Sequence, residues 1–418
     1  MTPAIGRLLV GVMCAAAACA RGPERVLTIS GSMLGREGQV LALQLERFRQ
    51  AHPDLSVALR ATPDAADLRH QLYVQWLNAH VGEPDVLQLD VVWTPEFAAA
   101  GWIRSLDEFR APVDELFASA VAANRWQGHL YALPWFIDVG MLYWRTDLMP
   151  APPDSLASLA ETSTSLIAAQ RVPMGLVWQG ARYEGLITNF VEHLGAFGGA
   201  ILDDQGRVVV DSDPAVRALT YMRDSIHADG IVPSAALTWQ EEHTRFAFQN
   251  GQAAFMRNWP YAYALLADEE ESQVAGRFAV APMPGAAGGA PTAALGGSTL
   301  AINAHSDQPE DAYLLIEFLL QPQQMIERAR IAGQFPPARA LYDTADLEAA
   351  LTVPAAEARR IIEAAVPRPV TPVYSQLSSI LQVSVHRALT RQQEPRAALA
   401  EAAGGIRSLL ARLELASP

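Results

Sequence analysis

Between residues 26 and 91, short apolar runs alternate with stretches whose apolar positions repeat at helical spacing. Residues 26–30 (VLTIS) are apolar or β-branched and end at a glycine, which predicts a buried strand. In residues 39–51 the apolar positions follow a helical repeat that stops at a His-Pro pair. The same pattern predicts a strand at 55–59, a helix at 67–77 and a strand at 85–91. This β-α-β-α-β order predicts a parallel sheet with helices on both of its faces.

The pattern is interrupted after residue 143 and restarts in a new unit after the prolines at 150–153. The apolar stretch 135–143 is followed by a proline-rich run at 150–153, which predicts a crossing into a second unit. Residues 283–297 are rich in glycine and poorly patterned, so they are predicted to form a connector that ends in a tight turn. Further helices are predicted at 154–169, 213–228 and 309–321, and the chain from 343 onward is predicted to be mainly helical.

Length and composition narrow the class of protein. A chain of 418 residues is longer than a single hydrophobic core usually organises, so two lobes or domains are expected. Hydrophobic residues make up 50% and charged residues 18%, which is typical of a globular protein and too polar for several membrane spans. The net charge of -14 disfavours nucleic acid as a partner, because phosphate backbones are bound by basic surfaces. The expected fold class is therefore α/β with two lobes.

The first residues have the pattern of an export signal. A weakly basic start precedes the apolar stretch 8–18, which is shorter than the roughly 20 residues that a spanning helix needs. Residues 16–19 (AAAC) resemble the lipobox of bacterial lipoproteins, which implies a signal peptide at 1–18, acylation of Cys19 and a lipidated linker at 19–25. The alternative is an ordinary cleaved secretory signal. In both cases we expect an exported protein, either lipid-anchored at the outer face of the cytoplasmic membrane or periplasmic.

Six segments together resemble the extracellular solute-binding proteins of carbohydrate ABC importers, and within that family the trehalose- and maltose-binding members. They are LERFRQAHPDLSV, GEPDVLQLDVVWTPEFAAAGWI, LYALPWFIDVGMLYWRTDL, FQNGQAAFMRNWPYA, LGGSTLAIN and FPPARALYD. The resemblance spans most of the chain after the signal. It implies a type II-like periplasmic-binding-protein fold, with two lobes that each hold a mainly parallel sheet flanked by helices and are joined by a hinge.

The resemblance also implies how the chain divides between the lobes. The first lobe is expected to combine residues 26–137 with 283–333, and the second to combine 138–282 with 334–418. A ligand is expected to bind in the cleft between the lobes and to close it, as in other hinged binding proteins.

Charged residues are the first candidates for binding a sugar, whose hydroxyls need carboxylate, amide or guanidinium partners. Glu37 follows the first strand and matches a family position that contacts sugar hydroxyls; its alternative is a solvated acid at a helix start. Asp90 lies in an apolar run, where an unpaired charge is costly, and its alternative is a structural cap. Asp138 lies between apolar residues at the predicted crossing, which faces the cleft in the family. Arg368, between two prolines, matches a family position that reaches the sugar, with a surface arginine as the alternative.

Aromatic and small residues complete the candidate site. Trp259 matches a family aromatic that stacks on the sugar, and Tyr261 is a second candidate; core packing is the alternative for both. Gly296 and Gly297 would let the backbone approach a ligand closely. Ser298 stands where the family often has an aromatic residue, so one stacking surface differs from the family pattern.

These features predict a transport receptor that performs no chemistry. It would capture a trehalose- or maltose-like disaccharide and deliver it to the membrane permease of an ABC importer, as a monomer without cofactor or metal. Alternative ligands are an oligosaccharide, a polyamine or a glycerophosphodiester, and Arg36 and Arg257 leave the phosphate ligand open. The enzymatic alternative is a secreted glycoside hydrolase, which also uses paired acids. Nucleophile-elbow, zinc-protease and phosphate-loop motifs do not occur in the sequence, which disfavours an enzyme.

Overall fold

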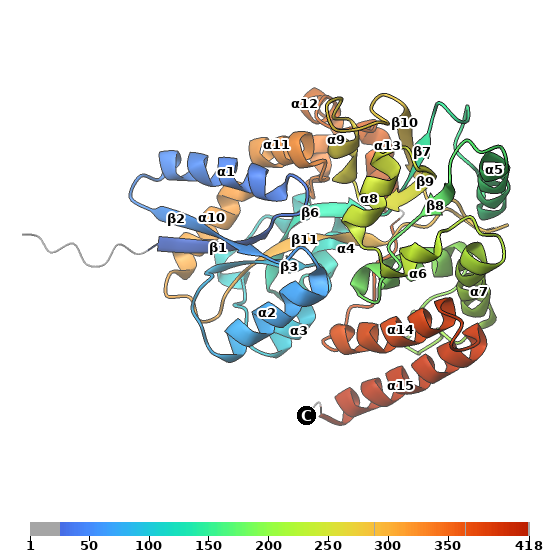
Figure 1. Ribbon diagram of the computed structural model, residues 1–418. Helices are drawn as coiled ribbons and strands as arrows, with labels where there is room; N and C mark the ends of the chain where they lie inside the picture. Colours follow the sequence, from blue (N-terminus) through green and yellow to red (C-terminus); the bar gives the residue numbers. More distant parts are fainter. Residues whose placement is uncertain (1–25, 288, 364, 417–418) are drawn as a thin grey trace, which may run out of the picture.

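The computed structural model describes residues 26–287, 289–363 and 365–416. The predicted signal peptide at 1–18, Cys19 and the linker up to residue 25 lie outside the described residues, so the lipid anchor remains a prediction. The described chain forms two bodies, each built on its own β-sheet (Figure 1). Within these described ranges, no helix is both long and apolar enough to cross a membrane.

The first body, called lobe 1, is built on a five-stranded sheet. Its strands are β1 (Val26–Ser32), β2 (Ser56–Thr62), β3 (Val86–Asp90), β6 (Ala132–Val139) and β11 (Leu295–Ile302), in the spatial order β2-β1-β3-β11-β6. Strand β1 is parallel to β2 and β3, whereas β11 is antiparallel to both of its neighbours. Helices α1 (Glu37–Ala51), α10 (Pro309–Leu319) and α11 (Pro322–Ala332) lie on one side of the sheet, and α2 (Ala66–Asn78) and α3 (Thr94–Ala99) lie on the other (Figure 1).

The second body, called lobe 2, is built on a four-stranded sheet. Its strands are β7 (Met141–Arg145), β8 (Met174–Val177), β9 (Ala253–Asn258) and β10 (Phe278–Pro282), in the order β10-β7-β9-β8. Its helices are α5 (Leu156–Ala168), α6 (Glu184–Ala196), α7 (Asp213–His227), α8 (Glu241–Gln249), α14 (Tyr374–Leu389) and α15 (Pro395–Ala416). Helix α14 packs against α6 and α7, so the end of the chain belongs to this lobe.

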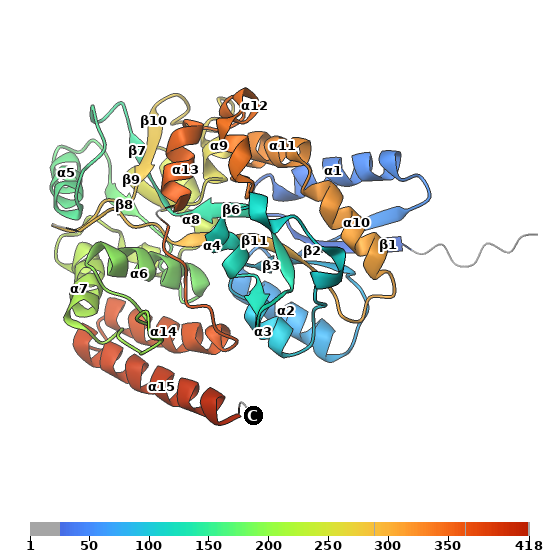
Figure 2. The same cartoon turned by 180° about the vertical axis from the view of Figure 1, so that it is seen from behind.

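The described chain also contains several shorter elements. They are α4 (Ala118–Ala122), β4 (Arg125–Trp126), β5 (His129–Leu130), α9 (Ala262–Leu266), α12 (Ala345–Glu348) and α13 (Ala355–Glu363). Seen from behind (Figure 2), α13 lies beside β6 and α12 lies beside α11. One buried cluster contains Ile137 of the first sheet, Tyr143 of the second and Ile362 of α13. The residue limits of the lobes expected from the sequence remain a prediction, and β6 continues two residues past the expected limit at 137, to Val139.

The structure confirms the strands and helices predicted between residues 26 and 91, with ends that differ by a few residues. It corrects the expectation of mainly parallel sheets, because both sheets are mixed and in lobe 2 only β8 and β9 are parallel. It also corrects the predicted turn at the end of 283–297, because residues 295–297 begin strand β11. Gly297 has a φ of +116°, and a Cβ there would lie 2.2 Å from the carbonyl oxygen of Phe136. The glycine therefore permits a close approach of two strands.

Candidate functional site

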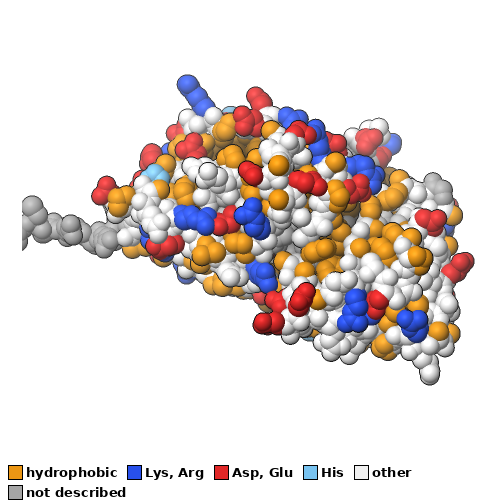
Figure 3. Space-filling model, turned by 90° about the horizontal axis from the view of Figure 1, so that it is seen from above, with side chains coloured by type: hydrophobic (Ala, Val, Ile, Leu, Met, Phe, Trp, Pro, Cys, Tyr) orange, Lys and Arg blue, Asp and Glu red, His pale blue; other side chains and the backbone are white. Residues whose placement is uncertain are grey.

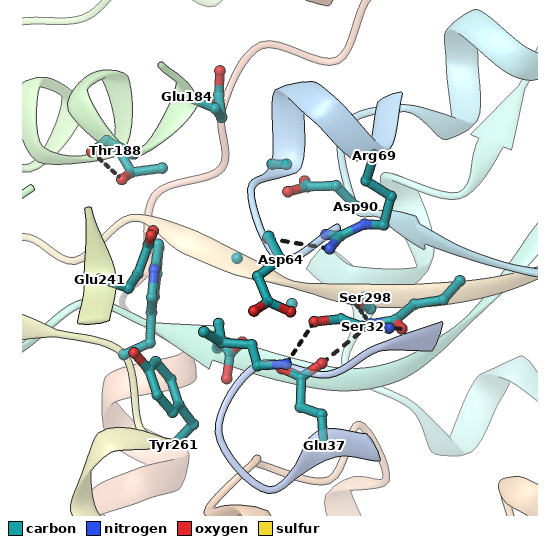
Figure 4. A pocket seen from close by; sticks show the side chains of 18 of the residues that line it. Ser32, Glu37, Asp64, Arg69, Asp90, Glu184, Thr188, Glu241, Tyr261 and Ser298 are labelled. Carbon is teal, nitrogen blue, oxygen red and sulfur yellow. Dashed lines mark hydrogen bonds between the residues drawn. The ribbon is translucent and has the colours of Figure 1, made fainter. Parts of the chain in front are cut away.

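A cavity of about 690 Å³, partly open to solvent, lies between the two lobes. All nine residues that the sequence predicts for ligand binding line it: Glu37, Asp90, Asp138, Trp259, Tyr261, Gly296, Gly297, Ser298 and Arg368. Figure 4 shows that the labelled side chains come from lobe 1 on one side and from lobe 2 on the other. The structure thus brings the predicted residues together, while their role in binding remains a prediction.

The wall contributed by lobe 1 is formed by the ends of parallel strands. Ser32, Asp64 and Asp90 end or follow β1, β2 and β3, whose carboxyl ends meet at one edge of the sheet. The Gln88 side chain accepts a hydrogen bond from the Ser32 N–H (2.7 Å) and donates one to the Ser298 hydroxyl (3.0 Å). An aromatic ring at position 298 would have to displace this buried contact, which gives a packing reason for the serine.

Glu37 is the first residue of α1 and only 6% exposed, so the alternative of a solvated acid is wrong. Its Oε1 accepts a hydrogen bond from the Gln334 amide at 2.9 Å, and its Oε2 lies 3.5 Å from the Gln88 amide. Burial raises the pKa of Glu37, and the positive charges of Arg328 and Arg69 oppose that rise. A carboxylate can accept about four hydrogen bonds, so Glu37 retains acceptor capacity toward the cavity.

Arg368 joins two carboxylates that come from different lobes. Its Nη2 donates to Asp90 Oδ1 at 2.9 Å, and its Nη1 donates to Glu184 Oε1 at 2.6 Å. Arg368 is only 4% exposed, so the alternative of a surface arginine is wrong. Asp90 Oδ1 also accepts a hydrogen bond from the N–H of Val92 at 3.2 Å. This is the kind of contact expected if Asp90 is a structural cap, the alternative role predicted from the sequence. Asp90 therefore has a structural role in addition to its place in the cavity wall.

Asp138 lies in β6 opposite Gly296 of β11, where the chain leaves lobe 1. Its Oδ1 is buried and accepts no hydrogen bond from the described residues. Burial raises the pKa of Asp138 well above its usual range, and the negative charges of Glu37 and Asp90 add to the rise. A buried acceptor without a donor is costly, so this oxygen is suited to receive a hydrogen bond from a ligand.

Trp259 follows β9, and its half-buried side chain lines the cavity. The guanidinium of Arg257 lies over the indole, 3.9 Å from the ring centroid, and Arg257 is itself buried and ion-paired with Glu192. A Cβ at Gly296 would lie 3.1 Å from the indole, so this glycine gives the ring its room. The second aromatic candidate, Tyr261, donates its hydroxyl to Glu242 at 2.8 Å. Tyr261 therefore lines the cavity, but its hydroxyl is already hydrogen-bonded to Glu242.

Sequence reasoning missed further polar residues of the cavity wall, which are Ser32, Asp64, Arg69, Gln88, Tyr183, Glu184, Thr188 and Glu241. Asp64 follows β2 just as Glu37 follows β1, so the rule of strand ends could have found it. Glu184 and Glu241 are the first residues of α6 and α8. An acid is favourable at a helix start for electrostatic reasons alone. The sequence therefore gives no signal that distinguishes Glu184 and Glu241 as cavity residues from ordinary helix-start acids.

The cavity carries more acidic than basic groups. Six carboxylates line it, against the two guanidinium groups of Arg69 and Arg368. Of the two arginines that left a phosphate ligand open, Arg257 is buried against Glu192 and Arg36 pairs with Asp268 at 3.3 Å. This arrangement disfavours an anionic ligand, which would need free cationic groups. Acidic and basic side chains are scattered over both bodies on the face seen in Figure 3.

Among the residues that the structure describes, no three or more His, Cys, Asp or Glu side chains are grouped so that they could hold a metal ion. The arrangement offers many hydrogen-bond acceptors, two guanidinium groups and several aromatic rings. It is suited to binding an uncharged molecule with many hydroxyl groups.

Comparison with known proteins gives consistent matches. The sequence profile of a family described as bacterial extracellular solute-binding protein matches residues 36–326. A probable ABC transporter-binding protein of Deinococcus radiodurans is 36% identical over 357 residues, which cover 82% of this chain and 84% of that protein. The structure of maltose-bound MalE3 of T. maritima is 39% identical, with a TM-score of 0.88 over 92% of this chain and 99% of that chain.

A more distant structure shows the same fold. An ABC transporter solute-binding protein of Thermotoga lettingae with bound α-D-tagatose is 23% identical to this chain. Its TM-score is 0.84, over 92% of this chain and all of that one (100%). The two-lobed fold is therefore kept where most of the side chains differ.

Proposed function

Because this chain belongs to the bacterial extracellular solute-binding proteins, we propose that it is the sugar-binding subunit of an ABC importer. Its ligand is a maltose- or trehalose-like disaccharide, taken up in the cavity between the two lobes. The 39% identity to maltose-bound MalE3 over nearly the whole of both chains supports a sugar of this size. The net acidic wall and the indole of Trp259 support a neutral ligand that has both hydroxyl groups and an apolar ring face.

The observation that carries this proposal is the buried Oδ1 of Asp138, which has no donor among the described residues. Sugar hydroxyls are donors that can lie in a cavity without adding charge. Hydrogen bonds to charged groups contribute about 1.5–3 kcal/mol each, and a micromolar complex needs about 8 kcal/mol in total. A few such contacts with stacking on Trp259 are enough for capture.

Closure follows from the distribution of the wall residues between the lobes. Asp90 and Asp138 belong to strands of lobe 1, whereas Trp259 and Glu241 belong to lobe 2. A ligand can touch all four only when the lobes are together, so it binds the closed form more tightly and shifts the population toward it. The closed form would then deliver the sugar to the membrane subunits of the importer.

The lipid anchor, the monomeric state and the absence of catalysis, which the sequence predicts, are part of the same proposal. An exported receptor that is acylated at Cys19 would stay close to its permease at the membrane. The receptor acts as a monomer and performs no chemistry on its ligand. Chromatography of a maltose or trehalose solution after long incubation with the protein would reveal glucose if the chain were a glycoside hydrolase.

A thermal-shift screen over sugars, phosphodiesters and polyamines tests the proposed ligand class. A ligand present at 100 times its Kd stabilises the folded protein by about 2.7 kcal/mol, which raises the melting temperature by several degrees. We expect this shift with maltose or trehalose and none with glycerophosphocholine or spermidine. A shift with glycerophosphocholine or with spermidine, and none with either sugar, would contradict the proposal.

A further inference from the structure

Two groups of polar contacts join helices of different lobes outside the candidate sugar cavity. In the first group, Asp67 in the first turn of α2 accepts two hydrogen bonds from lobe 2. Its Oδ1 accepts from the backbone N–H of Glu184 at 3.1 Å, and its Oδ2 accepts from the Gln382 amide of α14 at 3.1 Å. One carboxylate of lobe 1 therefore holds the start of α6 and the middle of α14 together.

The second group lies between α3 and the start of α14. The Ser375 hydroxyl donates to Glu96 Oε2, and the His70 ring nitrogen Nε2 lies 3.0 Å from the same oxygen. His70 and Glu96 belong to lobe 1, and their side chains are only 16% and 14% exposed. The Ser375 contact is thus a largely desolvated hydrogen bond to a carboxylate across the two lobes, and such bonds are stronger than those between neutral groups.

The helices on both sides are fixed to their own lobes. Tyr73 of α2 donates its hydroxyl to the Gln88 carbonyl of β3 at 2.9 Å, which ties α2 to the first sheet. Helix α14 packs against α6 and α7 of lobe 2. Rotation of one lobe away from the other therefore has to break the contacts of Asp67 and Ser375.

These contacts also connect to a residue of the sugar cavity. Glu184, whose N–H binds Asp67, accepts hydrogen bonds on its carboxylate from Arg368, Tyr374 and Ser378. Asp67 and Ser375 themselves do not line the sugar cavity; they border a separate cavity of about 420 Å³. Their contacts are thus coupled to the site without belonging to it.

We propose that Asp67 and Ser375 are positioning residues that stabilise the closed form and thereby set the affinity for every ligand of this receptor. This inference rests on the proposed function, because it assumes that closure traps a ligand. The apparent Kd equals the intrinsic Kd divided by the fraction of protein in the binding-competent form. Weakening a contact made only in the closed form therefore raises the Kd of all ligands by the same factor.

The test compares two serines of the same helix. Ser375→Ala removes the contacts of this hydroxyl with Glu96 and His70 of lobe 1, whereas Ser379→Ala removes a hydroxyl whose hydrogen bond runs within α14, to the Ser375 carbonyl at 2.8 Å. We expect Ser375→Ala to raise the Kd for maltose and trehalose by a common factor of roughly 5 to 50, and Ser379→Ala to leave it unchanged. Asp67→Ala provides an independent variant with the same expected direction. An unchanged Kd in both Asp67→Ala and Ser375→Ala, or factors that differ between sugars, would overturn the proposal.

A second readout measures closure without any ligand. The chain has no cysteine after residue 19, so dyes can be placed on Gln50→Cys of α1 and Glu161→Cys of α5, both exposed positions on different lobes. We expect Ser375→Ala to reduce the population with the short dye distance in single-molecule fluorescence, relative to Ser379→Ala. Equal populations would refute the role in closure. This readout needs no sugar, so it tests the inference separately from the proposed function. A failure of the proposed function would instead appear as no sugar binding by the unmodified chain.

Discussion

At Asp138 the folded protein keeps a carboxylate in a place where its charged form is disfavoured. The Oδ1 atom is buried without a donor, and the nearby Glu37 and Asp90 add like charge. Natural proteins depart from the rule of satisfied buried polar groups mainly at functional sites. A ligand hydroxyl would supply the missing donor, so the same carboxylate that weakens the free protein would strengthen the complex.

We expect Asp138→Asn to make the free protein more stable at pH 7 and to weaken its binding of sugar. An acid whose pKa is raised by folding destabilises the folded state once it is deprotonated. This cost appears as the pH rises above the ordinary pKa of 3.8, grows up to the raised pKa, and is constant above it. Urea unfolding without sugar should show a gain of about 1–3 kcal/mol for Asp138→Asn at pH 7 and almost none at pH 3.

The control for this experiment is the same change at an exposed aspartate, Asp54→Asn, which should leave stability and binding unchanged at both pH values. A loss of stability in Asp138→Asn at pH 7 would mean that the carboxylate is satisfied in the folded protein, and the physical reason for its place in the site would be wrong.

At the scale of elements, local signals in the sequence predicted more than the pairing of distant segments. The alternation between residues 26 and 91 predicted β1, α1, β2, α2 and β3, because each of these elements is encoded by its own repeat. The same strand ends and crossings pointed to Glu37, Asp90 and Asp138. The antiparallel insertion of β11 between β3 and β6 was not predicted, because its partners lie more than 150 residues earlier in the chain. The contacts of Arg368 were missed for the same reason, since Glu184 is 184 positions away.

Arg368 lies in the segment between α13 and α14. Its hydrogen bonds to Asp90 and Glu184 hold this segment in place. Because Asp90 and Glu184 would lose their partner, we expect Arg368→Met to lower the free energy of unfolding by about 3–5 kcal/mol. Arg396→Met removes an exposed ion pair with Asp213 and should cost less than about 1 kcal/mol. Chemical denaturation of both variants checks this difference, and equal effects would show that the buried bridge is not important for the fold.

At the scale of the whole molecule, the two lobes contribute different walls to one cavity. Lobe 1 provides most of the carboxylates at strand ends, and lobe 2 provides Trp259 held over Arg257. Asp67 and Ser375 join the lobes beside the site, and Arg368 joins them within it. If the proposed function is right, this division lets a ligand bring the lobes together, because only a molecule that reaches both walls favours closure.

Isothermal titration of the mature chain with maltose and with trehalose shows whether this cavity binds a sugar. We expect saturable binding of one sugar molecule per chain for at least one of the two. Trp259→Ala should lose about tenfold or more in affinity, because it removes the indole that lobe 2 contributes to the cavity, and Asp54→Asn should bind as the unmodified chain does. Binding of neither sugar, or unchanged affinity in Trp259→Ala, would contradict a sugar site between the lobes.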